Sequence, residues 1–550
     1  FIIAKVEKRM KHILYIFILL AGFSSIQAQL FKELSTEVGL DYMYPGTDHQ
    51  EVGAGITILD VNNDGWDDIF QSGGIFPSKL WINKKGKFVD ATVEYGIDTL
   101  AHLYVQGVCA ADFDNDGYED LFVSNMAIPP HRGDDSFPML LKNIEGKRFE
   151  PVFAADFFFK GHYPASYWGD INGDGFVDLY LIDYVEEMDH TFYADLIPSG
   201  YKPYCLHNKV YLNEGGAGFK EVSRELNLND VGCGLAGAFT DFDNDNDVDF
   251  ILMNDFGSWN HLGNKIYRND YPDFHFTDIT DSVGFKTEFY GMGVGPGDIN
   301  NDGILDYYLT NIGENRLIEN HIDTMYNVAR QKGVDFTSMT DTTTGTSWSG
   351  IFFDIENDGD VDLFVTKGYL ESLEPVEILD ENRMFINDGI GNFTDVTKKS
   401  GANDSLVHRG AAYVDYDHDG DLDIVCGVIK MRRSEFAKTD QKIKLFENQA
   451  NKDNNWIGFK LIGKDGVNHS AVGCSVTFVK GDTGKQIREV DGGTAHSSQS
   501  TKTLYFGLGE EKFAKEIEIQ WIGKGTTEIK KLKGGHVYSI DPSGEIKVIY

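Results

Sequence analysis

Seven copies of one acidic nine-residue pattern recur along this chain. The pattern is D-x-[DN]-x-D-G-x-x-D, and its copies begin at Asp60, Asp112, Asp170, Asp241, Asp298, Asp354 and Asp415. Positions 1, 3, 5 and 9 carry oxygen side chains, and position 7 can offer its backbone carbonyl. Calcium takes about six to eight oxygen ligands in flexible geometry, and a glycine at position 6 permits the sharp turn that gathers them. The pattern therefore predicts up to seven bound Ca²⁺ ions.

Each copy, numbered loop 1 to loop 7 in chain order, contributes four expected ligands. They are Asp60, Asn62, Asp64 and Asp68; Asp112, Asp114, Asp116 and Asp120; Asp170, Asn172, Asp174 and Asp178; Asp241, Asp243, Asp245 and Asp249; Asp298, Asn300, Asp302 and Asp306; Asp354, Glu356, Asp358 and Asp362; Asp415, Asp417, Asp419 and Asp423. Loop 4 has Asn246 in place of glycine, and asparagine tolerates a left-handed backbone, so we expect the turn to survive. Loop 6 has Glu356 at position 3, one methylene longer than aspartate, and we expect it to bind more weakly.

The spacing of the loops indicates the fold. Successive copies start 52 to 71 residues apart. An EF-hand needs flanking helices and a glutamate at loop position 12, but that position is Gln71 in loop 1 and Cys426 in loop 7. Repeats of about 40 to 50 residues with four strands each are typical of propeller blades. The loops therefore predict an all-β chain built around a seven-bladed β-propeller.

The sequence around each loop supports four strands per repeat. A segment of small residues precedes the loop, as suits a strand crowded against a central channel. A short apolar run follows it, then a segment ending in asparagine, then the pattern F-x-[DE]-[VI]-[ST]. The seventh repeat lacks that last pattern after Asn448, whereas residues 31–40 carry it ahead of loop 1. We therefore expect the N-terminal segment to complete the last blade and leave no unpaired sheet edge.

The charge of the chain agrees with metal binding. The chain has 87 acidic and 49 basic residues, a formal charge of −38, and thirty of the acids lie within the seven loops. Carboxylates packed so closely repel one another unless cations neutralise them. A solvated acidic surface accounts for the remaining excess. Nucleic-acid binding is disfavoured because the chain has no basic stripe.

Residues 1–28 have the pattern of an export signal. Residues 1–9 look like upstream readthrough, Met10 is the expected start, Lys11 supplies the positive charge, and residues 13–21 form an apolar run before a cleavage site after Ala28. The run is too short for a transmembrane helix, and no later segment could span a bilayer. We therefore expect a protein without a transmembrane segment, secreted or periplasmic.

Five cysteines are few for a chain of this length, and no C-x-x-C motif is present. Cys109 and Cys426 lie in apolar segments and are expected to be buried thiols. Cys205 and Cys233 are the one pair considered for a disulfide.

The repeats stop near residue 450. We expect a propeller over residues 29–450 and a small β-sandwich-like domain over residues 451–550, where alternating strands are separated by Gly, Asp and Asn turns. The loops and their flanking strands resemble FG-GAP/VCBS repeats, the propeller class of integrin α-subunits. The tail resembles the ASPIC/UnbV domain at Asn455-Trp-Ile-Gly, Val472-Gly-Cys-Ser-Val, Arg488-Glu-Val-Asp-Gly-Gly, Phe506-Gly-Leu-Gly and Ile519-Gln-Trp-Ile-Gly.

The combination resembles bacterial relatives of cartilage acidic protein. Two positions depart from the family pattern, since Cys474 stands where alanine is usual and Ile522 where proline is usual. The resemblance is specific for architecture and implies an integrin-α-like calcium propeller. It implies little about function, because a propeller supports many activities.

Candidate ligand-binding residues lie in the connections between the second and third strands of the repeats. If the calcium loops join strands 1 and 2, these connections lie on the opposite face of the propeller. They are long, and exposed aromatic and polar side chains there would suit recognition of a sugar or a peptide. The alternative is that they are packed decoration. The candidates are His131, Tyr184, His190, Tyr193, Tyr201, Trp259 and His261.

Two functions remain open at this point. The chain has no nucleophile elbow, no H-E-x-x-H motif and no phosphate-binding loop. This favours an exported, non-catalytic calcium-binding scaffold for a glycan or protein partner. The alternative is a calcium-dependent carbohydrate-active enzyme such as a polysaccharide lyase, with His131, His190 or Tyr184 as the base. The oligomeric state is left open.

Overall fold

Repeated antiparallel sheets make up most of the described chain. The computed structural model describes residues 29–44, 53–126, 137–152, 157, 161–185, 204–257, 261–285, 288–335, 345–370, 380–430, 441–450, 453–479 and 484–550. Within these residues, the chain before residue 450 forms seven four-stranded sheets, and the chain after it forms two more. The all-β prediction is therefore confirmed.

The first four propeller sheets follow the chain, with strands paired in sequence order. They are β2 (Ile56–Leu59), β3 (Asp68–Gln71), β4 (Lys79–Asn83) and β5 (Phe88–Asp90); β6 (Val105–Ala111), β7 (Asp120–Asn125), β8 (Met139–Asn143) and β9 (Phe149–Val152); β10 (Ser166–Gly169), β11 (Asp178–Leu181), β12 (Lys209–Asn213) and β13 (Phe219–Glu221); β14 (Gly234–Thr240), β15 (Asp249–Asn254), β16 (Lys265–Asn269) and β17 (Phe276–Asp278).

The other three continue the pattern. They are β18 (Gly291–Gly297), β19 (Asp306–Asn311), β20 (Arg316–Asn320) and β21 (Met325–Asn327); β22 (Ser347–Phe353), β23 (Asp362–Lys367), β24 (Arg383–Asn387) and β25 (Phe393–Asp395); β26 (His408–Val414), β27 (Asp423–Val428), β28 (Lys444–Asn448) and β1 (Phe31–Glu33). Short helical turns follow some outer strands or lie between sheets: α2 (Ser35–Val38), η1 (Ile97–His102), α5 (Ala329–Lys332) and α6 (Thr397–Ser400).

The inner strands close a ring. Each first strand contacts the next one along the chain, from β2 through β6, β10, β14, β18 and β22 to β26, and β26 contacts β2 again. In every sheet one nine-residue acidic loop joins the first strand to the second, as Leu59 pairs with Asp68 across loop 1. The seven loops therefore lie at one end of the propeller.

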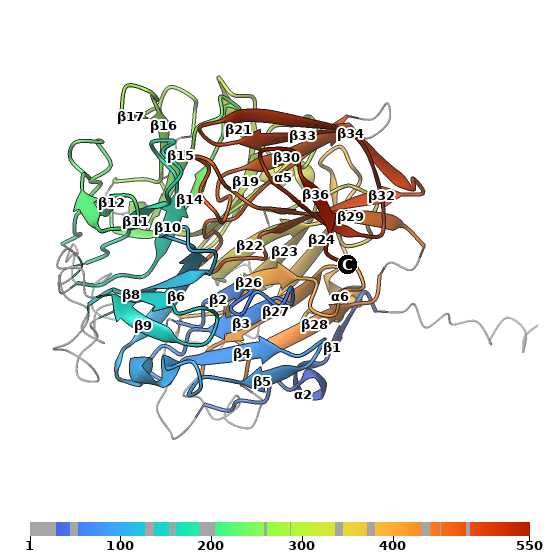
Figure 1. Ribbon diagram of the computed structural model, residues 1–550, viewed down its shortest axis with the longest axis horizontal. Helices are drawn as coiled ribbons and strands as arrows, with labels where there is room; N and C mark the ends of the chain where they lie inside the picture. The colour runs from blue at the N-terminus through green and yellow to red at the C-terminus, as the bar shows by residue number, and fades with distance from the viewer. Residues whose placement is uncertain are drawn as a thin grey trace, which may run out of the picture.

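The N-terminal segment completes the last sheet, as predicted. Strand β1 pairs antiparallel with β28, with Phe31 opposite Asn448. Phe31 is fully buried and packs edge-on against Phe353 of the preceding sheet. The earliest and the latest propeller strands thus lie side by side, drawn in blue and orange in Figure 1.

The C-terminal residues form two further sheets. One has the order β32 (Thr503–Gly509), β29 (Asn455–Leu461), β35 (Val537–Ile540), β36 (Ile546–Val548); the other β31 (Lys485–Glu489), β30 (Ser475–Val479), β33 (Phe513–Trp521), β34 (Gly525–Lys533). They pack face to face through Phe459, Phe478 and Phe506. The same core cluster continues into the propeller at Phe239 and Val248, so the two parts of the chain share one hydrophobic core.

A segment of the C-terminal domain fills the centre of the ring. Residues 491–501, which we call the plug, hydrogen-bond to six of the seven inner strands: β2, β6, β10, β18, β22 and β26. Glycines in or next to those strands make room for it. A Cβ on Gly55 would lie 2.2 Å from the Ser497 carbonyl oxygen, and one on Gly410 would lie 2.4 Å from Ser498 Oγ.

The small residues before each loop therefore border a channel that the plug fills. The sequence predicted that these strands are crowded against a central channel, but not that another segment of the chain occupies it. Among the described residues, no helix has the length and apolar character needed to cross a membrane.

Candidate metal-binding loops

The first aspartate of each loop is held by the backbone of its own loop. In all seven loops one carboxylate oxygen accepts the amide of position 5, at 3.0 to 3.2 Å. The other oxygen accepts the amide of position 6, at 2.7 to 3.1 Å. Asn246 takes the glycine position in loop 4 with φ 74°, so the expectation that asparagine preserves the turn is confirmed.

The aspartates at positions 5 and 9 are fixed in the same way. Position 5 accepts the amide of position 7 in every loop, which closes the turn. Position 9 begins the second strand, is at most 2 % exposed, and accepts the amide of position 2 through one oxygen. The loops are thus braced mainly by contacts among their own nine residues.

An asparagine at the end of each third strand links neighbouring sheets. Its backbone amide donates to the second oxygen of the position-9 aspartate, at 2.7 to 2.9 Å. Its side-chain amide donates to the carbonyl of position 2 in the preceding loop, as Asn143 does to Val61 at 2.8 Å. Asn83 does the same to Tyr416 of loop 7, so the chain of links closes on itself. The sequence showed this recurring asparagine but not its role.

Position 4 of each loop supplies a second link. All seven residues there have positive φ, from 55° to 66°, and they are Asn63, Asn115, Gly173, Asn244, Asn301, Asn357 and His418. In loops 1, 2, 4 and 6 the asparagine amide donates to the position-6 carbonyl of the following loop, as Asn63 does to Gly117 at 2.7 Å. Asparagine suits both needs, because it tolerates a left-handed backbone and carries a donor. This position was unassigned in the sequence pattern.

Several loops gather oxygen atoms that fit a metal ion. Three groups each bring three carboxylates within 4.8 Å of one another: Asp112, Asp114 and Asp120; Asp241, Asp243 and Asp249; Asp415, Asp417 and Asp423. Buried oxygens of Asp114, Asp243 and Glu356, all at position 3, have no hydrogen-bond partner in the described part of the chain. Buried anionic oxygens without partners are costly unless a cation pairs with them. An all-oxygen donor set of this kind suits a hard divalent cation.

The electrostatics of the loops point the same way. Burial, together with neighbouring carboxylates, raises the pKa of Asp170 and Asp241 to about 7 and that of Asp354 to about 8. The pKa of every position-9 aspartate is raised well above its usual value, again mainly by burial. Without a cation, these carboxylates are poorly stabilised as anions.

The C-terminal domain lies on the end of the propeller that carries the loops. Lys460 Nζ lies 3.2 Å from Asp60 of loop 1, and His469 Nδ1 lies 3.2 Å from Asp112 of loop 2. The Gly507 amide and the Tyr550 hydroxyl donate to Asp354 and Asp415, each at 3.1 Å. The last residue also stacks on His418, whose other face covers Trp66 of loop 1. Several loops predicted to bind metal are therefore interdomain contacts as well.

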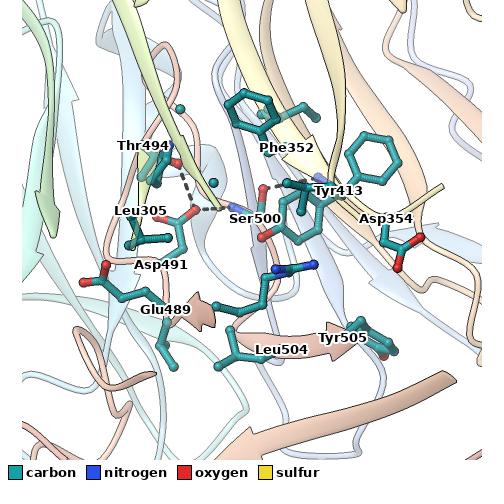
Figure 2. Close-up of a pocket in the computed structure, with 18 of the residues that line it drawn as sticks. Leu305, Phe352, Asp354, Tyr413, Glu489, Asp491, Thr494, Ser500, Leu504 and Tyr505 are labelled. Atoms are coloured by element: carbon teal, nitrogen blue, oxygen red, sulfur yellow. Dashed lines mark hydrogen bonds between the residues drawn. The ribbon is translucent and has the colours of Figure 1, made fainter. Parts of the chain in front are cut away.

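The plug is anchored at the mouth of the channel. Asp491 accepts the Thr494 hydroxyl at 3.1 Å and the Ser500 amide at 2.9 Å, which pins the two ends of the plug together (Figure 2). Beside it lies a cavity of about 60 Å³ lined by Asp354, Tyr413 and Glu489, among others. A buried oxygen of Glu489 there has no hydrogen-bond partner among the described residues. A cavity of this size and polarity suits ordered water.

The predicted ligand-binding residues are placed only in part. Tyr184 is 1 % exposed, and its hydroxyl donates to Asp255 at 2.6 Å, so the interpretation of this tyrosine as an exposed contact residue is wrong. Its ring belongs to an apolar cluster with Phe256 and Met292, which removes it from solvent. His261 is exposed and lies 3.5 Å from Glu288. His131, His190, Tyr193, Tyr201 and Trp259 lie outside the described residues.

The structure gives the state of all five cysteines. Cys205 and Cys233, the one pair considered, form a disulfide with Cα atoms 4.7 Å apart. Cys109, Cys426 and Cys474 are buried free thiols.

Comparisons with known proteins identify the two building blocks. A family model described as FG-GAP-like repeat matches residues 60–123, 241–309 and 377–426, and one described as ASPIC and UnbV matches residues 464–547. Cartilage acidic protein 1 of Xenopus tropicalis is 23% identical over 505 residues, covering 86% of this chain and 70% of that protein. The Homo sapiens protein of the same name is 22% identical over 542 residues, covering 92% and 75%.

Solved structures are more distant. A rhamnogalacturonan lyase of Bacillus licheniformis has a TM-score of 0.40 at 10% identity, covering 77% of this chain and 76% of that one. An Agrocybe aegerita lectin, solved for its recognition of non-reducing terminal N-acetylglucosamine, has a TM-score of 0.37 at 16% identity, covering 62% and 79%. Similarities at this level carry no argument about activity.

Proposed function

For a chain built of FG-GAP-like repeats and a C-terminal ASPIC and UnbV domain, we propose an exported calcium-binding propeller that recognises a glycan or protein partner without catalysis. One observation carries the calcium part of the proposal. All seven loops share one backbone brace, and three of them leave a buried position-3 carboxylate oxygen without a hydrogen-bond partner among the described residues. Export is inferred from the sequence pattern of residues 10–28.

The recognition surface is proposed at the end of the propeller away from the metal loops. Successive hairpins of an antiparallel sheet lie at opposite ends of its strands, so the connections from second to third strand face away from the C-terminal domain. The loop end and the channel are occupied by that domain and its plug. The exposed His261 lies in one of these connections, between β15 and β16. A partner bound there would not compete with the metal.

A calcium-dependent lyase gains no support from the described residues. Of the three candidate bases, only Tyr184 is described, and its hydroxyl is buried against Asp255. A base must reach a proton on the substrate, and Tyr184 is closed to solvent in this arrangement.

The proposal is tested by metal analysis and by separating the two ends of the propeller. Purified full-length protein should carry calcium, and its melting temperature should fall when the metal is removed. A glycan and protein array with and without Ca²⁺ identifies the partner, and an assay for lyase products on the same glycans tests for catalysis.

Two substitutions then separate stability from recognition. Asp417→Ala should lower the melting temperature and leave partner affinity unchanged below the melt. Trp259→Ala should weaken binding by about 1–3 kcal/mol with little change in melting temperature. Protein without calcium would refute the metal proposal. Loss of partner binding in Asp417→Ala alone, at full stability, would refute the placement of the recognition surface.

A further inference from the structure

The C-terminal domain places a positively charged side chain next to some loops but not next to every described loop. Lys460 Nζ lies 3.2 Å from Asp60, and its side chain lines a cavity of about 390 Å³ between the domains. It meets the Asp60 oxygen that already accepts the Gly65 amide. Asp60, Asp67 and Glu119 line the same cavity as this ammonium, so its charge faces three carboxylates.

Loop 3 provides a comparison within the same molecule. Its expected ligands, Asp170, Asn172, Asp174 and Asp178, have the same residue types in the same order as those of loop 1. The C-terminal domain contacts loop 3 through glycine backbone, with Gly466 and Gly523 packed against Gly175 and Gly173. Among the described residues, Asp170 forms no salt bridge. The two loops therefore offer the same ligand side chains under different electrostatic conditions.

A fixed ammonium next to a metal ligand lowers the affinity of that site for a cation. The charge repels a second cation over a few ångströms, and burial limits the screening by water and salt. The ammonium also pairs with the same carboxylate that would bind the metal. Among the described residues, no lysine or arginine forms an ion pair with a ligand of loop 3, and Lys524, which lines the pocket beside Asp170, donates instead to the Asp465 carbonyl.

From this contrast we infer that the C-terminal domain makes the metal loops unequal, and that Lys460 holds loop 1 at a lower calcium affinity than loop 3. The inference rests on the proposed calcium binding. In this inference the charge of Lys460 weakens metal binding at loop 1, and this effect is separate from the contact that Lys460 makes between the two domains. Metal binding at loop 1 would in turn weaken the ion pair between Asp60 and Lys460. Binding of metal to this loop would therefore change the stability of the domain interface.

Loop 1 can be observed separately because Trp66 stands at its position 7. Tb³⁺ replaces Ca²⁺ in oxygen sites, and its emission is sensitised by an indole a few ångströms away. Trp66 also stacks on His418 of loop 7, so loop 1 is reported by the part of the tryptophan-excited Tb³⁺ signal that is lost both in Trp66→Phe and in Asp64→Ala. Calorimetric titration with Ca²⁺ reports all the loops together.

Lys460→Met should tighten the Trp66-dependent Tb³⁺ site by about tenfold or more, the effect expected when a nearby like charge is removed. Lys460→Arg keeps the charge and should leave the affinity unchanged, which also controls for altered packing. Lys464→Met is the matched control, because Lys464 pairs with Asp541 in the same domain, away from the loops. In Asp64→Ala, which removes a ligand side chain of loop 1, the further change Lys460→Met should have no effect on the remaining sites.

The outcomes separate this inference from the proposed function. Wild-type protein that binds neither Ca²⁺ nor Tb³⁺ would refute calcium binding itself. Wild-type protein that binds both, with the Trp66-dependent affinity unchanged or weaker in folded Lys460→Met, would overturn the inference and leave the proposed function standing. If Lys460→Met does not fold, Lys460→Gln gives the same comparison with a polar side chain in the cavity.

Discussion

One asparagine in each repeat ties the propeller together at the scale of single residues. Asn143 shows the pattern: its backbone amide donates to Asp120, its side-chain amide donates to the Glu119 and Val61 carbonyls, and its oxygen accepts the Gly146 amide. Asp120, Glu119 and Gly146 belong to the same repeat as Asn143, and Val61 belongs to the preceding loop. A buried residue that satisfies so many backbone groups is expensive to replace.

Substitution of Asn143 should therefore destabilise the protein strongly. Asn143→Ala leaves the Val61 and Glu119 carbonyls and the Gly146 amide without this partner, and should cost about 2–4 kcal/mol of the free energy of unfolding. Asn143→Asp is nearly isosteric but sets acceptor oxygens against two carbonyls, so it should cost more. Denaturant unfolding measures both. Asn392→Ala, which removes exposed hydrogen bonds to Asp388 and Lys332, is the control and should change stability by less than about 0.5 kcal/mol.

At the scale of elements, the plug and the N-terminal strand hold the ring closed. Gln499 is the main anchor of the plug: its backbone pairs with Ile56 and Ile58 of β2, and its side-chain amide pairs with both backbone groups of Ala110 in β6. Strand β1 closes the outer edge, where β28 would otherwise be unpaired. The two elements act at opposite sides of the sheets, the plug within the channel and β1 at the rim.

Removing the side-chain amide of Gln499 should loosen the C-terminal domain from the propeller. Gln499→Ala leaves the buried amide and carbonyl of Ala110 unpaired and should cost about 3 kcal/mol. Calorimetry should show the single melt of the parent protein broadening or splitting into two transitions. A melt that keeps its shape and midpoint would mean that the plug contributes little to the coupling of the domains.

Deleting the completing strand should expose a sheet edge. Protein that begins at residue 41 lacks β1 and should aggregate or lose its cooperative melt, because β28 then presents unpaired backbone groups. Protein that begins at residue 29 is the control, since it retains every described residue, and it should behave like the parent. Gel filtration and calorimetry compare the two, and a monomeric, cooperatively melting short form would show that the ring closes without β1.

At the scale of the whole molecule, the buried acids couple metal, pH and stability. Burial raises the pKa of these carboxyls in the folded protein above their values in the unfolded chain, to about 7 for Asp170 and about 8 for Asp354. The folded state therefore holds protons more tightly. By linkage, the stability that these groups contribute is fully present at low pH and is lost as pH rises through the folded pKa values.

Metal-free protein should thus become less stable between about pH 5 and pH 8. Ca²⁺ stabilises the ionised carboxylates, so excess metal should flatten or reverse this trend and raise the melting temperature most at the higher pH. Thermal melts across this range, after removal of metal by a chelating resin and after its return, test the expectation. A metal-free melting temperature that rises with pH would contradict it.

The sequence by itself determined the features that depend on neighbours along the chain. Each loop is braced mainly by hydrogen bonds among nine consecutive residues, so the pattern from Asp60 to Asp68 already specifies the turn. The left-handed backbone of Asn246 was expected because asparagine tolerates that conformation. The N-terminal strand was predicted because the last repeat lacks its own fourth strand.

The tertiary structure alone decided how distant parts of the chain meet. The plug contacts distant residues, since Ser498 accepts the amide of Ile56, 442 positions earlier, and its Ser, Gly and Gln residues resemble an ordinary loop. The burial of Tyr184 depends on Asp255, 71 positions later. The charge opposite Asp60 comes from Lys460, on another domain. Local patterns encode local hydrogen bonds, whereas packing and charge pairing between domains depend on which surfaces the closed ring presents.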